Sequence, residues 1–134
     1  ADVRAIIDTN ITLGQWPTRR AACDRLETLT AKLRAAGVTH AWAGHYDGLF
    51  HTNLTEVNNR LAAGCNGAPR PKTGGGRGEP RLVPFASINP TAPNWESELD
   101  RCLTVHKMPG IRLHPNYHNF KLDHPNFARL LTAA

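Results

Sequence analysis

No stretch of the sequence is long and apolar enough to cross a membrane, and no signal-peptide pattern is present. A membrane span needs roughly 18 or more consecutive apolar residues, so we expect no membrane partner. The three cysteines are odd in number and form no C-x-x-C pair. They argue against a disulfide framework and a zinc knuckle, and they favour a reducing, cytoplasmic location.

The basic excess of the chain is confined to one segment. The chain has 16 Lys and Arg residues against 11 Asp and Glu, a formal net charge of +5. Residues 67–81 hold four of the basic residues and one acidic residue, which leaves 12 against 10 elsewhere. A nucleic-acid face usually spreads along a helix or groove with interleaved aromatic side chains, so we expect no nucleic-acid partner. Residues 66–80 are rich in Gly and Pro and are predicted to form a flexible basic surface loop.

The length of the chain limits the number of domains. At 134 residues it can form one domain with a real core and is too short for two ordinary ones. It begins with Ala rather than Met, and its last residues read as the middle of a helix without a cap. We therefore expect residues 1–134 to be a fragment of a longer protein.

Apolar periodicity predicts alternating strands and helices. Short β-branched runs are typical of strands, and apolar residues at spacings of three and four are typical of amphipathic helices. The predicted strands span residues 6–14, 38–46, 82–88 and 111–114, and the predicted helices span 19–36, 50–64, 94–105 and a stretch from Asp123. Thr18 and Asn53 are expected helix N-caps, and Glu56 stands at capping-box spacing from Asn53.

This alternation predicts an α/β fold with a parallel sheet covered by helices. A doubly wound open sheet and part of a (β/α)8 barrel both fit the pattern. No G-x-G-x-x-G turn follows the first strand, which weakens a dinucleotide-binding fold. Four units in 134 residues are about half of the roughly 250 residues of a complete barrel. We therefore predict the first half of a TIM-type (β/α)8 barrel, that is, a single partial (β/α)4 unit.

Each predicted strand has an apolar middle and a polar end. Since the active site of such barrels lies at the C-terminal ends of the strands, these polar side chains predict a mouth that faces a ligand. His118 follows the fourth strand closely enough to reach the same place. The residues at or just after the four strand ends are Asn10 and Thr12; His45, Tyr46 and Asp47; Ser87 and Asn89; and Arg112 and His114.

Three segments carry a family resemblance. Ile6–Gly14 looks like an opening I-D-x-H-x-H-x-G motif, and Arg81–Pro90 is similar to a third-strand motif that starts with Arg and ends in Asn-Pro. Gly110–Pro115 followed by Leu122–Pro125 is similar to G-I-[KR]-L-H-P…L-D-D-P. In these motifs, their order and their spacing, the chain resembles the amidohydrolase superfamily. It resembles specifically the amidohydrolase-2 branch, which includes decarboxylases related to aminocarboxymuconate-semialdehyde decarboxylase.

The resemblance implies a (β/α)8 barrel that usually binds one divalent metal such as zinc. Family members take two metal ligands from histidines of the first strand, and the metal activates a water for attack on a carbonyl or related centre. Asn10 and Thr12 stand where those histidines are expected, and an amide and a hydroxyl are poor zinc ligands. We therefore predict no metal ligand in this chain, and the cofactor stays open.

Three functions remain as hypotheses. The first is an amidohydrolase-like hydrolase, or a lyase such as a decarboxylase, that acts on a small substrate with a carboxylate or carbonyl group. The second is a non-catalytic homologue that binds a small molecule. The third is an assembly role, in which the basic loop contacts an acidic partner. Other expected partners are the remaining half of the barrel or a second copy of the chain.

In the hydrolase hypothesis, the polar residues of the mouth divide into two groups. Histidine is suited to acid–base work near neutral pH, and arginine can hold a carboxylate by a bidentate contact. The predicted catalytic residues are His114 and His45, and the predicted substrate-binding residues are Asn10, Thr12, Asn89, Arg112 and His118.

Overall fold

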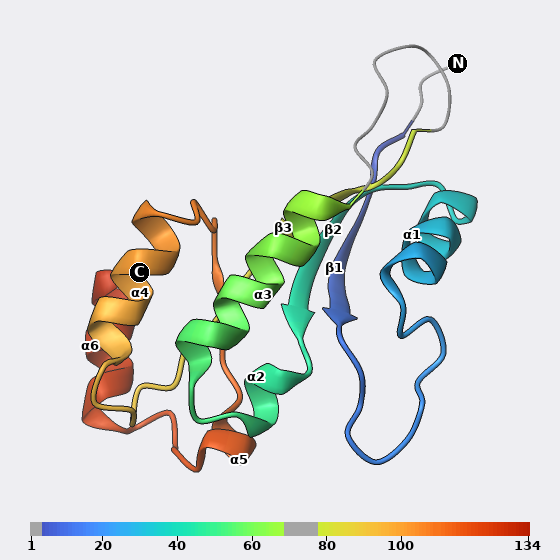
Figure 1. Ribbon diagram of the computed structural model, residues 1–134. Coiled ribbons are helices and arrows are strands. Elements are labelled where there is room, and N and C mark those ends of the chain that lie inside the picture. Colours follow the sequence, from blue (N-terminus) through green and yellow to red (C-terminus); the bar gives the residue numbers. More distant parts are fainter. Residues whose placement is uncertain (1–3, 69–77) are drawn as a thin grey trace.

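The computed structural model describes residues 4–68 and 78–134, which form a mixed α/β fold with parallel strands (Figure 1). None of the helices in these two ranges has the length and apolar character that crossing a membrane requires. In chain order the elements are β1 (Ile6–Leu13), α1 (Leu26–Ala35), β2 (Val38–His45), α2 (Asp47–Phe50), α3 (Leu54–Gly67), β3 (Arg81–Pro84), β4 (Ala86–Ser87), α4 (Trp95–Thr104), β5 (Ile111–Arg112), α5 (Pro115–His118) and α6 (Pro125–Ala133).

The strands form two short parallel sheets that meet at Phe85. One sheet has the order β1-β2-β3 and the other pairs β4 with β5. The Phe85 backbone N–H donates to the Ala43 carbonyl at 2.9 Å, whereas the next N–H, of Ala86, donates to the Gly110 carbonyl at 3.0 Å. The predicted strand 82–88 is therefore two strands, because the chain changes its pairing partner at Phe85. All strands point the same way, so their C-terminal ends lie at one end of the molecule, next to α2 and α5 (Figure 1).

Helices cover one face of the first sheet. Ala41 and Ala43 are fully buried in a core that includes Leu33 of α1 and Leu61 of α3. A second core packs α4 and α6 against β4; its buried members are Ala62, Ala86, Ile88, Trp95, Leu99, Cys102, Met108 and Leu130.

The opposite face of the first sheet is more open. Because side chains alternate along a strand, Trp42 points away from the core that holds Ala41 and Ala43. Trp42 stacks on Phe85 with ring centroids 4.8 Å apart and is still 38% exposed, while Ile7 on β1 is 51% exposed. Large apolar side chains exposed on one sheet face mark a surface that another element can cover.

The first helix begins later than the sequence predicts. α1 starts at Leu26, and residues 19–25 lie outside it. Cys23 has φ +60°, a left-handed conformation that interrupts a right-handed helix. An ion pair between Arg20 and Asp24 stabilises the preceding loop, and the Thr18 hydroxyl accepts a hydrogen bond from the Trp16 indole at 3.1 Å. The prediction of Thr18 as a helix N-cap is therefore wrong.

The predicted helices 94–105 and from Asp123 are close to α4 and α6, whereas the predicted helix 50–64 is shifted: residues 51–53 are not helical, and α3 runs from Leu54 to Gly67. Asn53 caps α3, and its side chain accepts a hydrogen bond from the Glu56 N–H at 3.3 Å, so that predicted cap is confirmed. The last helix begins at Pro125 and is capped by His124, whose Nδ1 accepts from the Asn126 N–H at 3.1 Å. The sequence does not predict the short helix α2.

The predicted loop 66–80 has narrower limits than expected. Residues 66 and 67 still belong to α3, and Pro80 is fully buried before β3 begins. Residues 69–77, the middle of that predicted loop, lie outside the described residues.

Candidate functional site

A pocket of about 380 Å³ opens at the C-terminal ends of the strands. We call it the mouth pocket. It brings together five of the seven predicted site residues, and the two others, Asn89 and His118, do not line it. Its lining residues are Asn10, Thr12, Gly44, His45, Tyr46, Leu49, Arg112, Leu113 and His114.

Arg112 reaches from β5 across the sheet to the first two strands. Its Nη1 donates to the Ile11 carbonyl at 2.9 Å, and its Nη2 donates to the carbonyls of Thr9 at 3.1 Å and Trp42 at 2.6 Å. A Cβ atom on Gly44 would lie only 2.7 Å from Nη1, so glycine at this position makes room for the guanidinium. Burial lowers the pKa of Arg112, with a smaller opposing effect from Asp8. Three of the five N–H groups of the guanidinium therefore bind backbone, and the bidentate carboxylate contact expected from the sequence has fewer free donors.

His45 is held in one orientation at the end of β2. Its side chain is 11% exposed, and its Nδ1 accepts a hydrogen bond from the Asp47 N–H at 3.1 Å. An Nδ1 that accepts carries no proton, so the neutral ring carries its proton on Nε2. Burial lowers the pKa of His45 and outweighs the opposing effect of the Asp47 carboxylate, which an ion pair with Arg60 holds at 2.9 Å. His45 is therefore a neutral hydrogen-bond donor through Nε2.

Gly14 packs closely against the His45 ring, and the Gly14→Ala substitution tests this contact. Gly14 has φ +86°, and an added Cβ would lie 2.6 Å from His45 Cε1. We expect the free energy of unfolding to fall by about 2 kcal/mol, because a left-handed alanine is strained and the ring must move. Urea denaturation measures the loss, and NMR of the His45 ring reports its displacement.

The matched control for Gly14→Ala is Gly67→Ala. Gly67 ends α3, and an added Cβ there meets no atom within 4 Å. We expect its free energy of unfolding to change by no more than about 0.5 kcal/mol. A Gly14→Ala protein as stable as the Gly67→Ala protein, with the His45 signals unmoved, would contradict the close contact.

His114 and His118 lie at the two ends of α5, beside the short helix α2. Their ring centroids are 5.6 Å apart at an interplanar angle of 84°. His118 Nε2 lies 2.7 Å from the Gly48 carbonyl, to which it donates, while its Nδ1 is buried without a partner in the described part of the chain. Burial, with help from His118 and Arg112, lowers the pKa of His114 to about 4. His114 is therefore neutral at pH 7 and faces the mouth pocket, with His118 behind it.

Gly48 permits the close approach of α2 to β4. A Cβ atom on Gly48 would lie 2.2 Å from the Ser87 hydroxyl oxygen and 3.8 Å from His114 Nε2. Ser87 itself is fully buried, and its hydroxyl has no hydrogen-bond partner among the described residues. Behind His114, α2 and β4 therefore pack so closely that a side chain larger than that of glycine does not fit at position 48.

Asn89 has a local role away from the mouth pocket. Its side-chain oxygen accepts hydrogen bonds from the Thr91 N–H at 3.0 Å and from the Thr91 hydroxyl at 2.6 Å. This arrangement is an Asx turn that ends the strand segment and leads toward α4. Asn89 lines a separate cavity of only about 10 Å³, too small for a substrate.

A row of aromatic side chains starts at Tyr46 in the mouth pocket, and apart from Tyr46 the sequence analysis did not single out its members. Trp16 packs edge-to-face on Tyr46 and Phe50 at 5.5 and 5.2 Å, and Phe50 packs the same way on Tyr117 at 5.4 Å. Phe50 and Tyr117 remain 44% and 52% exposed. The signal that could have found them is their position, since each aromatic follows a strand end within a few residues of the polar site residues.

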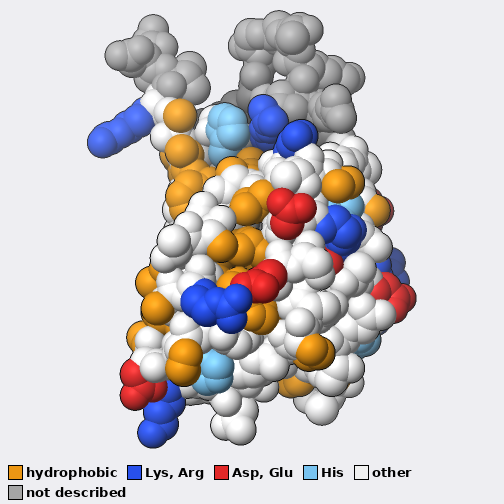
Figure 2. Space-filling view, turned by 90° about the vertical axis from the view of Figure 1, so that its left-hand side faces the viewer, with side chains coloured by type: hydrophobic (Ala, Val, Ile, Leu, Met, Phe, Trp, Pro, Cys, Tyr) orange, Lys and Arg blue, Asp and Glu red, His pale blue; other side chains and the backbone are white. Residues whose placement is uncertain are grey.

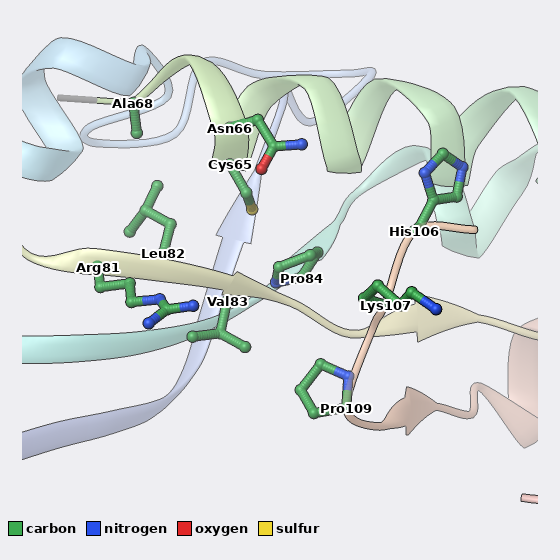
Figure 3. Close-up of a pocket in the computed structure, with 10 residues that line it drawn as sticks. All are labelled: Cys65, Asn66, Ala68, Arg81, Leu82, Val83, Pro84, His106, Lys107 and Pro109. Carbon is green, nitrogen blue, oxygen red and sulfur yellow. The ribbon is translucent and has the colours of Figure 1, made fainter. Parts of the chain in front are cut away.

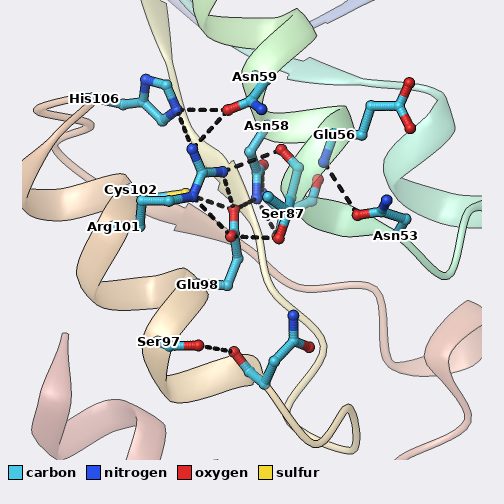
Figure 4. A network of polar contacts seen from close by, with 12 residues as sticks. Asn53, Glu56, Asn58, Asn59, Ser87, Ser97, Glu98, Arg101, Cys102 and His106 are labelled. Atoms are coloured by element: carbon cyan, nitrogen blue, oxygen red, sulfur yellow. Dashed lines mark hydrogen bonds and ion pairs between the residues drawn. The ribbon is translucent and has the colours of Figure 1, made fainter.

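A buried polar network fixes the strand end behind the site (Figure 4). Asn58 of α3 accepts from the Ser87 N–H at 2.8 Å and donates to the Ser87 carbonyl at 3.0 Å. The same amide donates to the Glu98 carboxylate of α4 at 2.9 Å, which also accepts from Thr55 at 2.7 Å and pairs with Arg101 at 2.7 Å. Two helices and β4 are thereby held in one arrangement beside Gly48.

The described residues do not fit the metal that the family resemblance implies. Within residues 4–68 and 78–134, no group of three or more His, Cys, Asp or Glu side chains is arranged to hold a metal ion. Asn10 and Thr12 line the mouth pocket, but an amide and a hydroxyl bind zinc poorly.

No protein-family model matches the chain, and no curated protein matches it in sequence. The resemblance to the amidohydrolase superfamily thus stays a prediction from the three segments Ile6–Gly14, Arg81–Pro90 and Gly110–Pro125.

Proposed function

We propose that the chain is the N-terminal half of an amidohydrolase-like (β/α)8 barrel. Its mouth pocket would take a small substrate with a carboxylate or carbonyl group, for hydrolysis or decarboxylation. The observation that carries this proposal is the convergence of Asn10, Thr12, His45, Arg112 and His114 on one pocket of about 380 Å³ from three strand ends. Active sites of (β/α)8 barrels are built at this end of the strands.

Two features of the sheet support the barrel. The strands are parallel, and those that pair follow each other in sequence around the junction at Phe85. A barrel repeats such neighbours in order, whereas a doubly wound sheet reverses its strand order at a switch point. The exposed Trp42 and Ile7 lie on the sheet face opposite the helices. In a closed barrel this face is the interior, where the other strands would bury both side chains.

The side chains of the mouth pocket divide the chemistry between a base and a donor. Neutral His114 can take a proton from a water or from the substrate, because it is unprotonated at pH 7. His45 presents an Nε2–H donor that can stabilise negative charge developing on a substrate oxygen. Arg112 supplies a fixed positive charge near both, which favours an anionic substrate.

The aromatic row suggests the shape of the substrate. Tyr46 lines the mouth pocket itself, and Trp16, Phe50 and Tyr117 continue the row outward. Aromatic rings bury flat apolar surface efficiently, so the substrate is expected to carry its carboxylate or carbonyl on a planar apolar body.

A non-catalytic homologue is the second candidate function. The observation that favours it is that Asn10 and Thr12 stand at the positions of two metal-binding histidines in the family that the chain resembles. In that case the mouth pocket would bind a small carboxylate, or serve in assembly, without turning a substrate over.

A substrate panel separates the two functions. Small esters, lactones, amides and conjugated carboxylic acids are incubated with the intact protein, and both product formation and binding are measured. The proposal expects product from at least one planar carboxylate-bearing compound. Binding without any product would favour the non-catalytic homologue. If no compound binds and no product forms, a ligand site at the mouth pocket is contradicted.

A further inference from the structure

Charged side chains gather closely beside the mouth pocket and are spread out elsewhere. A cavity of about 640 Å³ at the start of β3 has Arg81 and Lys107 at its opposite ends (Figure 3). On the face that Figure 2 shows, Lys and Arg side chains are scattered, with acidic side chains between them. The closer set surrounds Asp47, the first residue of α2, which directly follows the mouth-pocket residues His45 and Tyr46.

The Asp47 carboxylate lies near three nitrogen-bearing side chains. Arg60 of α3 pairs with Oδ2 at 2.9 Å. His51 Nε2 lies 3.6 Å from Oδ1, and His45 Nδ1 lies 3.7 Å from Oδ2. Hydrogen bonds from nitrogen to oxygen usually span about 2.7–3.2 Å. Of the three side chains, only Arg60 is therefore at hydrogen-bond distance from the carboxylate.

Two groups of Asp47 lie close to the same ring nitrogen of His45. The Asp47 backbone N–H donates to Nδ1 at 3.1 Å, and the carboxylate oxygen Oδ2 lies 3.7 Å from that nitrogen. The N–H can donate only to an Nδ1 without a hydrogen, whereas a carboxylate can accept only from an Nδ1 that carries one. The position of the ring proton therefore depends on which of the two groups of Asp47 binds Nδ1.

We propose that Arg60 is a positioning residue for His45. By binding Oδ2, Arg60 holds the Asp47 carboxylate away from Nδ1. Nδ1 then stays the acceptor of the backbone N–H, and the ring proton stays on Nε2. This assignment rests on the proposed function, in which that Nε2–H donates to a substrate oxygen.

The loss of Arg60 changes what His45 presents to the mouth pocket. The freed Asp47 carboxylate can approach Nδ1 and accept a hydrogen bond from it, which is stronger than a bond between neutral groups. The ring then gains a proton at Nδ1 from solvent and releases the one at Nε2. Nε2 becomes an acceptor, so His45 no longer supplies the donor that the proposed reaction uses.

A purely structural role of the ion pair predicts a different result. The Arg60 side chain is 42% exposed and that of Asp47 is 23% exposed. Ion pairs with this much solvent contact contribute little to stability, so we expect Arg60→Gln to change the folding equilibrium constant by less than about fivefold. A changed His45 ring in a protein that stays folded therefore distinguishes positioning from structural support.

NMR of the His45 ring nitrogens in the intact protein, without any ligand, tests the proposal. Nitrogen chemical shifts distinguish a ring nitrogen that carries a hydrogen from one that does not. We expect the Nε2–H form in the wild type and a majority of the Nδ1–H form in Arg60→Gln. Arg60→Lys keeps the positive charge and should restore the Nε2–H form. Because no substrate is needed, this result and the failure or success of the proposed function are obtained separately.

The pKa of His45 gives a second readout in the same experiment. Burial has the largest effect and lowers this pKa; the Asp47 carboxylate raises it, and Arg60 and His51 lower it. Removing the charge of Arg60 while Asp47 stays should therefore raise the pKa of His45 above its wild-type value.

Two further variants show whether Arg60 acts through Asp47. Arg25 lines the same cavity of about 180 Å³ as Arg60 and His45 but forms no ion pair among the described residues, so Arg25→Gln should leave the ring unchanged. Asp47→Asn removes the carboxylate and keeps the backbone N–H, so the Nε2–H form should persist. Adding Arg60→Gln to Asp47→Asn should then change nothing.

Four results would overturn the proposal. The first is that Arg60→Gln keeps the wild-type form of the His45 ring, and the second is that it unfolds the protein. The third is that Arg25→Gln changes the ring as much as Arg60→Gln does. The fourth is that Arg60→Gln has the same effect with and without the Asp47 carboxylate, because Arg60 would then not act through Asp47.

Discussion

Replacing Glu98 with alanine is expected to lower the free energy of unfolding by about 3 kcal/mol. Glu98 is only 5% exposed; its carboxylate accepts from Asn58 and Thr55 of α3 and pairs with Arg101 of its own helix. Removing it leaves the buried Asn58 amide and the Arg101 guanidinium without their main acceptor. Urea denaturation at neutral pH measures the loss.

The same carboxylate gives this effect a defined pH dependence. Burial alone would raise the pKa of Glu98, but hydrogen bonds from Arg101, Asn58, Thr55 and Cys102 lower it to about 2 from an ordinary 4.5. A lowered pKa means that the stabilisation is fully present above about pH 4.5 and is lost as the pH falls through about 2. The Glu98→Gln protein should therefore lose less stability than the wild type over this interval.

Glu96→Ala is the matched control on the same helix. Glu96 is 59% exposed and pairs with Arg129 at the surface. Exposed ion pairs contribute roughly 0–1 kcal/mol, so this variant should remain close to the wild type in stability. If the two alanine variants lose equal stability, or if the loss in Glu98→Ala is the same at pH 2 and pH 7, the network does not have the structural role assigned to it.

Replacing Arg112 with lysine is expected to cost about 2 kcal/mol of stability and to weaken ligand binding at the mouth pocket. The guanidinium reaches three backbone carbonyls on β1 and β2 at once. A lysine ammonium keeps the charge but cannot reproduce this planar set of donors. Urea denaturation measures the stability, and hydrogen exchange of the β1 and β2 amides locates the loss.

Arg129→Lys provides the comparison for Arg112→Lys. Arg129 lies on α6, is 58% exposed and pairs with Glu96, so lysine can replace it at little cost. If Arg112→Lys were as stable as Arg129→Lys, with unchanged exchange in β1 and β2, the bridging role of Arg112 would be wrong.

Much of the sheet could be predicted from local sequence. In the second half of β1, Ile11 and Leu13 are buried while Asn10 and Thr12 line the mouth pocket, a period of two that can be seen in the sequence. The exposure of Ile7 does not follow from that period, because the pairing of β1 with β2 shifts between Asp8 and Ile11. The change of partner at Phe85 could not be predicted, because it depends on which carbonyls, those of Ala43 and Gly110, lie beside the chain in the folded state. The break before α1 was missed because nothing in an apolar period of three and four reports the positive φ of Cys23.

The mouth pocket could be predicted in part for a related reason. Parallel strands bring their ends together, so Asn10, His45 and Arg112 could be assigned to one site from their position alone. The partners of each side chain could not. Arg112 turns toward distant carbonyls, and His118 is held by Gly48 of α2, a four-residue helix too short to leave a periodic signal.

The most direct test of the proposed function is the turnover of the best substrate from the panel by the His114→Asn protein. His114 is the neutral group assigned to proton transfer in the mouth pocket, and such a group typically contributes roughly a hundredfold or more to the rate. His40→Asn serves as the control, since His40 is an exposed histidine that does not line the mouth pocket. We predict that His114→Asn lowers kcat at least about a hundredfold while His40→Asn leaves it unchanged. Equal turnover by the two variants would contradict catalysis at the mouth pocket.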